Sequence, residues 1–279
     1  MMQRMCDALK FLCLWRWAGN RLVALCLAWG SCSVWADHLD LEASKDYLVG
    51  ASLALGDAHF SDAGAHLSLR PLFAFRLGRL RVASGRASAL LALGRAPVEA
   101  GVSAALISGD KWSLSTALRH DQGRPEVEGI AGTDLPGTLR GRVTVGYSLS
   151  DRWSVGASAS QDLLGKGGGL SGSTQIRYRY PVSEKTYWEA SLGAAGGNRV
   201  YMQGRYGVGA VSGVSPYTLS AGWDGIQLGW GYTSALDTHW VAFVSANASV
   251  LTGVAASSPL VQRPNSFVFT AGLAYRCCH

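Results

Sequence analysis

The segment from Thr138 to Asp162 constrains the fold more than any other part of the chain. Over 139–149 an apolar residue or a glycine occupies every second position, and polar or small residues lie between them. A tight turn at 150–152 separates this run from a second alternating run over 153–160. A period of two over two runs of about ten residues predicts a β-hairpin with one apolar and one polar face. This hairpin alone fits a soluble sandwich as well as a membrane barrel.

The same alternation recurs along the rest of the chain. Further alternating segments lie at 47–55, 98–107, 112–118, 175–180, 226–232 and 266–275. Long apolar runs of the kind that forms a membrane-spanning helix do not follow residue 36. Gly and Ser also interrupt nearly every window that could form an amphipathic helix. We therefore expect about 12 strands and no convincing helix. Fourteen strands result if 199–209 and 217–223 also span, and 78–97 is the least regular stretch.

Residues 1–36 have the organisation of a secretory signal peptide. Basic residues precede a short apolar core at 22–29, and Val34-Trp35-Ala36 offers a cleavage site. The alternative is a transmembrane anchor, but the apolar core is well short of the roughly 20 residues that a spanning helix needs. The sequence therefore predicts a signal peptide over 1–36 and a single mature domain over 37–279.

The composition favours a membrane barrel over a soluble sandwich. Only 16% of the residues are charged, against about 25% in soluble domains. Cleavage would remove four of the 25 Lys and Arg and one of the 19 Asp and Glu, which leaves a net charge of +3. The basicity thus belongs largely to the leader and gives no reason to expect nucleic acid as a partner. We predict an all-β fold, a transmembrane antiparallel β-barrel with its apolar face toward lipid and a polar interior.

Tryptophans recur just after short acidic turns. The turns that begin at Asp110, Asp151, Glu184 and Asp237 are each followed by a Trp on the apolar face. Indole prefers the headgroup level of a membrane, so repeated Trp at one end of successive hairpins predicts an interfacial girdle. The predicted periplasmic girdle consists of Trp112, Tyr147, Trp153, Tyr180, Trp188 and Trp240. Core aromatics of a soluble fold are the alternative.

The lengths of the connections orient the predicted barrel. The short turns 108–110, 150–152, 182–185 and 236–239 fall on one side, and the long connections 121–137, 163–170, 196–225 and 251–265 fall on the other. Outer-membrane barrels have short periplasmic turns and long extracellular loops. We therefore expect the short turns in the periplasm.

Arginines concentrate on the polar faces of successive strands. They are Arg140, Arg142, Arg152, Arg177 and Arg179. Because neighbouring strands lie about 4.8 Å apart, these side chains should form one basic wall in the lumen. One interpretation is an anion-preferring lumen. The other, which we favour, is a structural network paired with inward acids such as Asp162 and Glu189.

The sequence contains no recognisable catalytic constellation. HExxH, GxSxG and C-x-x-C motifs are absent, and the histidines are scattered. The glycine-rich run 165–169 resembles a phosphate loop only superficially, because its lysine precedes the glycines; we expect a flexible outer loop. Cys277, Cys278 and His279 are three adjacent terminal side chains without a second cluster. A Ser–His pair assembled in space at the rim stays open. We predict no enzyme, no cofactor and no metal site.

Several segments together resemble the MipA/OmpV family of outer-membrane proteins. They are the hairpin 138–164 with Gln161-Asp162-Leu163-Leu164-Gly165, Tyr201-x-x-x-x-Tyr206-Gly207-Val208, Ala210 to Tyr217, Asp237-Thr238-His239-Trp240, and Gly272 to Arg276. Their order and spacing carry the resemblance, whereas residues 37–100 match only loosely. The family's chains usually end in an aromatic that barrel-assembly machinery reads, and here Cys277-Cys278-His279 stands in that place.

The resemblance implies a β-barrel of the Gram-negative cell envelope, in contact with outer-membrane lipid. The namesake is described as a scaffold that joins a murein lytic transglycosylase to a peptidoglycan synthase. Such a partner would dock on the short turns near Asp110, Asp151, Glu184 and Asp237. An anion-preferring channel is one rival function. A surface adhesin or receptor that acts through 121–137, 196–225 and 251–265 is another.

Overall fold

The computed structural model describes residues 43–277 except 58, 61–63, 92–99, 125, 128–129, 131 and 211–214, with side chains from Tyr47 onward. The predicted signal peptide therefore lies outside the described residues, as do Cys278 and His279. Among the described helices, none combines the length and the apolar character that crossing a membrane requires.

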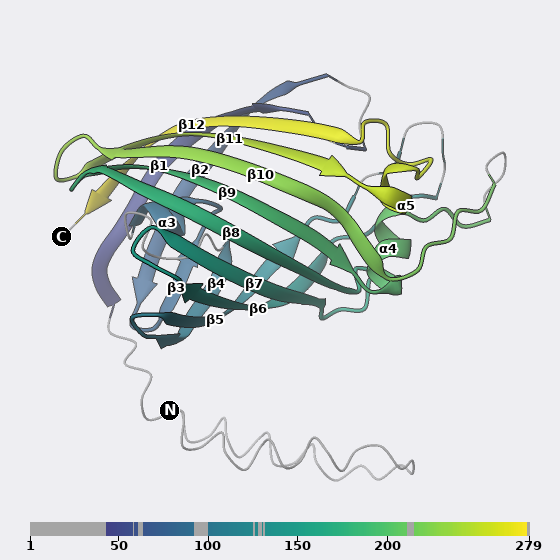
Figure 1. Cartoon of the computed structure of the whole chain (residues 1–279), viewed down its shortest axis with the longest axis horizontal. Helices are drawn as coiled ribbons and strands as arrows, with labels where there is room; N and C mark the ends of the chain where they lie inside the picture. Colours follow the sequence, from purple (N-terminus) through teal and green to yellow (C-terminus); the bar gives the residue numbers. More distant parts are fainter. Residues whose placement is uncertain are drawn as a thin grey trace, which may run out of the picture. The chain divides into compact units, whose positions relative to one another are not determined.

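Twelve antiparallel strands close into a barrel, in which each strand pairs with its neighbours in sequence and β1 pairs with β12 (Figure 1). The strands are β1 Ala43–Gly56, β2 His66–Leu77, β3 Leu80–Ala83, β4 Gly101–Ser108, β5 Trp112–Asp121, β6 Thr138–Ser148, β7 Trp153–Asp162, β8 Leu170–Ser183, β9 Thr186–Gly197, β10 Gly222–Ala235, β11 Trp240–Leu251 and β12 Asn265–Cys277. Closure gives every strand two partners, so the sheet has no free terminal strand. The predicted fold class and the predicted count of about 12 strands are confirmed.

The connections differ in length at the two ends of the barrel. Five short turns, at 78–79, 109–111, 149–152, 184–185 and 236–239, lie at the end where β1 begins and β12 ends; we call it the turn end. The longer connections 57–65, 122–137, 163–169, 198–221 and 252–264 lie at the opposite end, the loop end. The barrel thus has the asymmetry between turns and loops that its sequence predicts.

The alternation along the strands separates an apolar outer face from a polar inner face. On β6, Val143 points outward and is 47% exposed, while its neighbour Arg142 lines the lumen. On β12, Phe267 and Phe269 are exposed outside and Ala274 is fully buried inside. Large apolar side chains on the outside suit lipid, since water would penalise them. The protein is a transmembrane β-barrel.

Within the described residues, three helices of four to eight residues lie in the connections, and the sequence pattern did not predict them. They are α3 Ala87–Leu91, α4 Arg199–Tyr206 and α5 Gly253–Ala256. The possible strand over 199–209 is therefore excluded, because 199–206 is helical. Asn198 caps α4, and its side-chain oxygen accepts a hydrogen bond from the Tyr201 N–H at 2.9 Å. Helices this short depend on tertiary packing and leave little periodicity in the sequence.

The helix α3 packs against the inner face of the barrel wall near the turn end. Leu90 of α3 is 1% exposed. Its apolar cluster also includes Leu48, Leu72, Ala74, Ala83, Ala87, Ala235, Val241, Phe243 and Ala274. Apart from Ala87, which is itself part of α3, these residues belong to β1, β2, β3, β10, β11 and β12, so α3 fills one side of the lumen. We call α3 and this cluster the plug.

The connections at the loop end share two apolar clusters, which we call the lid. The first contains Met202, Tyr206, Leu219, Leu251 and Ala255, and the second contains Val127, Val208 and Leu260. Phe60 and Tyr217 pack against both clusters. The lid therefore joins the connections after β1, β5, β9 and β11 into one packed unit.

Candidate sites in the lumen, the lid and the rim

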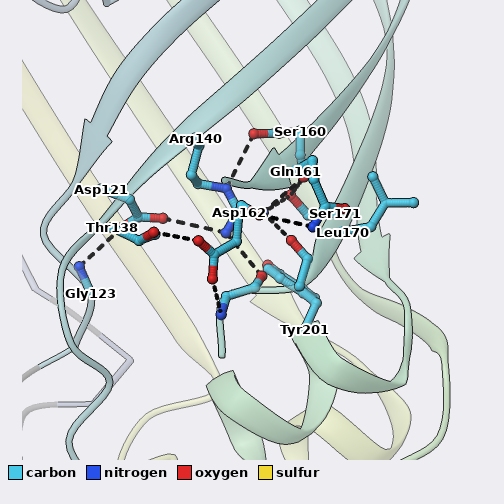
Figure 2. A network of polar contacts seen from close by, with 12 residues as sticks. Asp121, Gly123, Thr138, Arg140, Ser160, Gln161, Asp162, Leu170, Ser171 and Tyr201 are labelled. Carbon is cyan, nitrogen blue, oxygen red and sulfur yellow. Dashed lines mark hydrogen bonds and ion pairs between the residues drawn. The ribbon is translucent and has the colours of Figure 1, made fainter. Parts of the chain in front are cut away.

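Arg140 on β6 is the most extensively bonded arginine of the predicted wall. It is buried, and Figure 2 shows it beside Ser160 and Ser171. Its guanidinium donates to the carbonyl oxygens of Ser160, Gly168 and Gly169 at 2.9 to 3.1 Å. It also donates to the hydroxyls of Ser160 and Ser171. Five hydrogen bonds hold the guanidinium in one position, so Arg140 joins β6 to β7 and to the start of β8.

Asp162 completes this arrangement from the end of β7. Its carboxylate accepts a hydrogen bond from the Thr138 hydroxyl (Figure 2). It also accepts hydrogen bonds from the Leu164 and Gly168 N–H groups, at 3.0 and 2.9 Å. Gly168 thus donates to Asp162 and accepts from Arg140. A Cβ at Gly168 would lie 2.8 Å from Arg140 Nη1, so the close approach requires glycine. We call Arg140, Asp162 and Gly168 the loop clamp; it holds the glycine-rich connection that the sequence suggests to be flexible.

The other predicted wall arginines lie at different heights along the barrel. Arg142 and Arg177 line a polar cavity of about 410 Å³ below the lid. Arg179 lies over the ring of Tyr187, with its guanidinium carbon 3.8 Å from the ring centroid. Arg152 lies in the exposed turn after β6, 5.1 Å from the ring centroid of Tyr180. The structure therefore distributes the five arginines between the loop clamp, the cavity and the rim, as we call the five short turns of the turn end.

The predicted acidic partners have other contacts as well. Glu189 forms an ion pair with Arg86, just before α3, at 3.5 Å, and so ties the plug to β9. Arg140 lies 3.8 Å from the carboxylate of Asp121 on β5. Neither Arg86 nor Asp121 was predicted from the sequence. Asp121 could have been found, because it occupies a polar-face position if the alternation of 112–118 is extended by three residues.

A half-buried tyrosine, a buried tyrosine and a buried aspartate join the lid to the barrel wall. The hydroxyls of Tyr201 and Tyr206, both on α4, donate to Asp224 Oδ2 on β10 at 2.8 and 3.1 Å. Burial raises the pKa of Tyr201 to about 12, and the nearby Asp224 adds to the rise against the opposing effect of Arg205. Burial, together with Tyr201 and Asp224, raises the pKa of Tyr206 further. Both hydroxyls therefore remain hydrogen-bond donors at neutral pH.

The raised tyrosine pKa values predict that the lid loosens at high pH. A group whose pKa is higher in the folded state stabilises that state fully below its unfolded pKa, near 10, and loses this contribution as pH rises through the folded value. Protease cleavage within 198–210 should therefore increase between about pH 10 and 12. Tyr201→Phe should weaken this pH dependence. Unchanged cleavage across the interval in the native protein would contradict the prediction.

The predicted girdle residues form ring contacts on the outer face near the turn end. Trp112 contacts Tyr147 with ring centroids 4.6 Å apart, and Tyr180 stacks on Trp188 at 5.9 Å. Tyr178, which the sequence analysis did not assign to the girdle, lies between Trp153 and Trp188 at 4.8 and 5.4 Å. Trp240 contacts Tyr275 at 5.4 Å. Five consecutive strands, β5 to β9, thus carry aromatic side chains at the same end.

Backbone hydrogen bonds link the short turns of the rim to the next hairpin. The carbonyl oxygens of Lys111, Arg152, Lys185 and His239 accept from the N–H groups of Ser148, Arg179, Ala235 and Arg276. Asp237 also stabilises its own turn, since its carboxylate accepts from the N–H groups of Trp240 and His239. These bonds hold the pKa of Asp237 below its usual value. The backbone therefore ties each of these four turns to a following strand or turn.

Among the described residues, no three His, Cys, Asp or Glu side chains gather as a group that could hold a metal ion. A Ser–His contact of the kind that the sequence leaves open lies at the loop end. His59 Nε2 is 2.9 Å from Ser249 Oγ on β11, and His59 Nδ1 is 2.9 Å from the Arg263 carbonyl oxygen. The candidate functional sites are the basic cavity, the lid and the rim.

Comparison with solved structures gives several porins, all at low sequence identity. The NanC porin has 8% identity and a TM-score of 0.40, with 84% of this chain and 100% of that chain covered. The KdgM porin in complex with disordered oligogalacturonate has 10% identity and a TM-score of 0.42, with 83% and 99% covered. The anion-selective porin from Comamonas acidovorans has 10% identity and a TM-score of 0.38, with 85% and 100% covered.

No curated protein matches the chain significantly. The family model described as MltA-interacting protein MipA matches residues 49–277, from β1 to the end of β12. This match spans most of the chain and nearly the whole barrel. The chain therefore belongs to the MltA-interacting protein MipA family.

Proposed function

We propose that the protein is a non-enzymatic scaffold of the outer membrane, whose turn end faces the periplasm and docks murein enzymes. The family's description names an interaction with another protein. The apolar outer face and the aromatic contacts near the turn end support insertion in a bilayer. Short periplasmic turns are the rule in outer-membrane barrels, which supports a periplasmic rim within reach of murein enzymes.

The main support for the proposal comes from three acidic side chains of the rim that have no polar partner in the described part of the chain. Asp110, Asp151 and Glu184 lie in exposed positions in three successive turns. Within the described part of the chain, their carboxylates have no hydrogen bond or ion pair, unlike that of Asp237. Each is followed by a basic residue, so the rim presents closely spaced charges of both signs. Charges on a fixed backbone favour electrostatic recognition of a partner.

Neutralising the three acids should weaken docking without affecting the barrel. In the triple variant Asp110→Asn, Asp151→Asn, Glu184→Gln, we expect capture of a purified murein lytic transglycosylase or peptidoglycan synthase to fall about tenfold or more, since exposed charges each contribute up to about 1 kcal/mol. Binding measured by surface plasmon resonance at low and physiological salt tests this expectation.

Asp134→Asn is the matched control, because Asp134 is exposed at the loop end. This variant should retain binding. Asp237 is left unchanged, since its carboxylate supports its turn and its loss would confuse docking with folding. Full binding of both enzymes by the triple variant would refute docking through these acids.

An anion-preferring channel is the second candidate function. Three polar cavities, of about 410, 300 and 450 Å³, share Gln175 and Arg177. Their shared lining favours a continuous polar path, although the plug fills the other side of the lumen. Planar-bilayer recording separates the two functions, because a scaffold requires no ion current and an anion-preferring current would support the channel.

A further inference from the structure

The cavity below the lid is lined by an unusual excess of arginines. Its volume is about 410 Å³, and its charged lining consists of Arg119, Arg140, Arg142, Arg177, Arg205 and Asp121. Five positive side chains thus face one negative side chain, which is already hydrogen-bonded to the Gly123 N–H at 3.1 Å. This volume lies within the range of small-molecule sites.

Two of these arginines are direct cross-strand neighbours. Arg119 on β5 pairs in register with Arg140 on β6, and both face the lumen. Like charges directly opposite each other in a sheet destabilise it. Arg140 is fixed by carbonyl oxygens and lies 3.8 Å from the Asp121 carboxylate, whereas Arg119 has no such partner among the described residues. A bound anion near Arg119 would therefore reduce the repulsion further.

Arg119 and Arg177 have donors available for such a group. Over the residues that the structure describes, the side chains of Arg119 and Arg177 make no hydrogen bond or ion pair. Both are half-buried in the cavity wall. A guanidinium presents its donors in a planar fork that fits the oxygens of a phosphate or a carboxylate.

The remaining lining is suited to hydroxyl groups. Ser158 and Ser173 lie on β7 and β8, with their hydroxyl oxygens 2.9 Å apart, and Gln227 reaches the cavity from β10. A second cavity, of about 300 Å³, shares Gln175 and Arg177 and extends to Asp151 and Arg152 in the rim. A small hydrophilic molecule could therefore enter from the turn end.

We propose that this cavity binds a small soluble oxyanion of the sugar-phosphate class, with Arg119 and Arg177 holding the anionic group and the serine hydroxyls contacting the sugar. The site is independent of docking through the rim acids. A bound anion would also relieve the repulsion between Arg119 and Arg140.

Isothermal titration calorimetry on the refolded full barrel in detergent tests the proposal, with glucose 6-phosphate, inorganic phosphate and glucose as probes. Glucose 6-phosphate should bind most tightly. Arg119→Gln and Arg177→Gln should each weaken its binding about tenfold or more, because each removes a charge-assisted hydrogen bond. Arg79→Gln, in the exposed turn between β2 and β3, is the control and should bind normally.

Arg119→Gln should also change the melting temperature, in the direction opposite to that of a variant that folds poorly. Without ligand, it should raise the melting temperature by roughly 2 °C, since it removes the like-charge pair. The proposal is overturned if glucose or inorganic phosphate binds as tightly as glucose 6-phosphate, if no probe binds, or if both arginine variants bind like the native protein.

Discussion

Arg140→Ala is expected to lower the free energy of unfolding by about 3 to 5 kcal/mol, as the loss of one member of a buried charged network does. The substitution leaves the carbonyl oxygens of Ser160, Gly168 and Gly169 without their donor, in a buried position. It also leaves Asp121 without the cation that lies 3.8 Å away. Urea unfolding of the barrel in detergent micelles, followed by tryptophan fluorescence, gives the change directly.

Gly168→Ala tests the same clamp without removing a charge. Its Cβ would lie 2.8 Å from Arg140 Nη1 and 3.2 Å from Asp162 Oδ2, so the two side chains must separate. We expect a loss of about 1 to 3 kcal/mol, as for an overpacked site. Gly209→Ala is the matched control, because a Cβ at Gly209 meets nothing within 4 Å. Equal stability of the Gly168 and Gly209 variants would show that the clamp does not hold this connection.

The strands could be predicted because their information is local. Alternation fixes which residues face lipid, and Val143 and Arg142 take the sides that their positions indicate. In a closed antiparallel barrel most strand partners are also sequence neighbours, so the order of strands follows from the order of segments. Fold class and strand count were therefore accessible from period-two patterns and turn lengths alone.

The lid and the plug could not be predicted, because their contacts are distant in sequence. Phe60 packs with α4 and with Tyr217, about half the chain away, and no local periodicity signals this contact. The same holds for Leu90, whose neighbours come from both ends of the chain. Helices of four to eight residues, such as α3 and α4, form because packing stabilises them, so propensity alone is a poor guide.

The basic cavity was partly predictable. Arg140, Arg142 and Arg177 share its lining, as strand spacing suggests, but strand spacing does not separate clamped arginines from those with available donors. That distinction depends on the path of the connection 163–169, which brings the carbonyl oxygens of Gly168 and Gly169 to Arg140. The sequence does not specify this path. Arg205 lines the cavity from α4. Because α4 is a helix, the alternation along the strands could not predict this position.

Leu90→Ala in the plug should lower the free energy of unfolding by about 3 kcal/mol. Leu90 is 1% exposed, and its removal leaves a space between α3 and the inner faces of β1, β2 and β11. Truncation of a buried leucine costs about 2 to 5 kcal/mol, because the lost contacts add to an unfilled cavity. Leu228→Ala is the control, since Leu228 is 57% exposed on the outer face and should change stability by less than about 0.5 kcal/mol in detergent.

Leu90→Asp separates the plug's effect on stability from its effect on conduction. An unpaired carboxylate in an apolar cluster is strongly disfavoured, so α3 should leave the wall of the lumen while the twelve-stranded ladder persists. Planar-bilayer recordings should then show a larger ion current than in the native protein, with β-sheet circular dichroism retained. An unchanged current in a folded Leu90→Asp barrel would mean that α3 does not limit the passage of ions. The lid would then be the candidate for the narrowest part of the lumen.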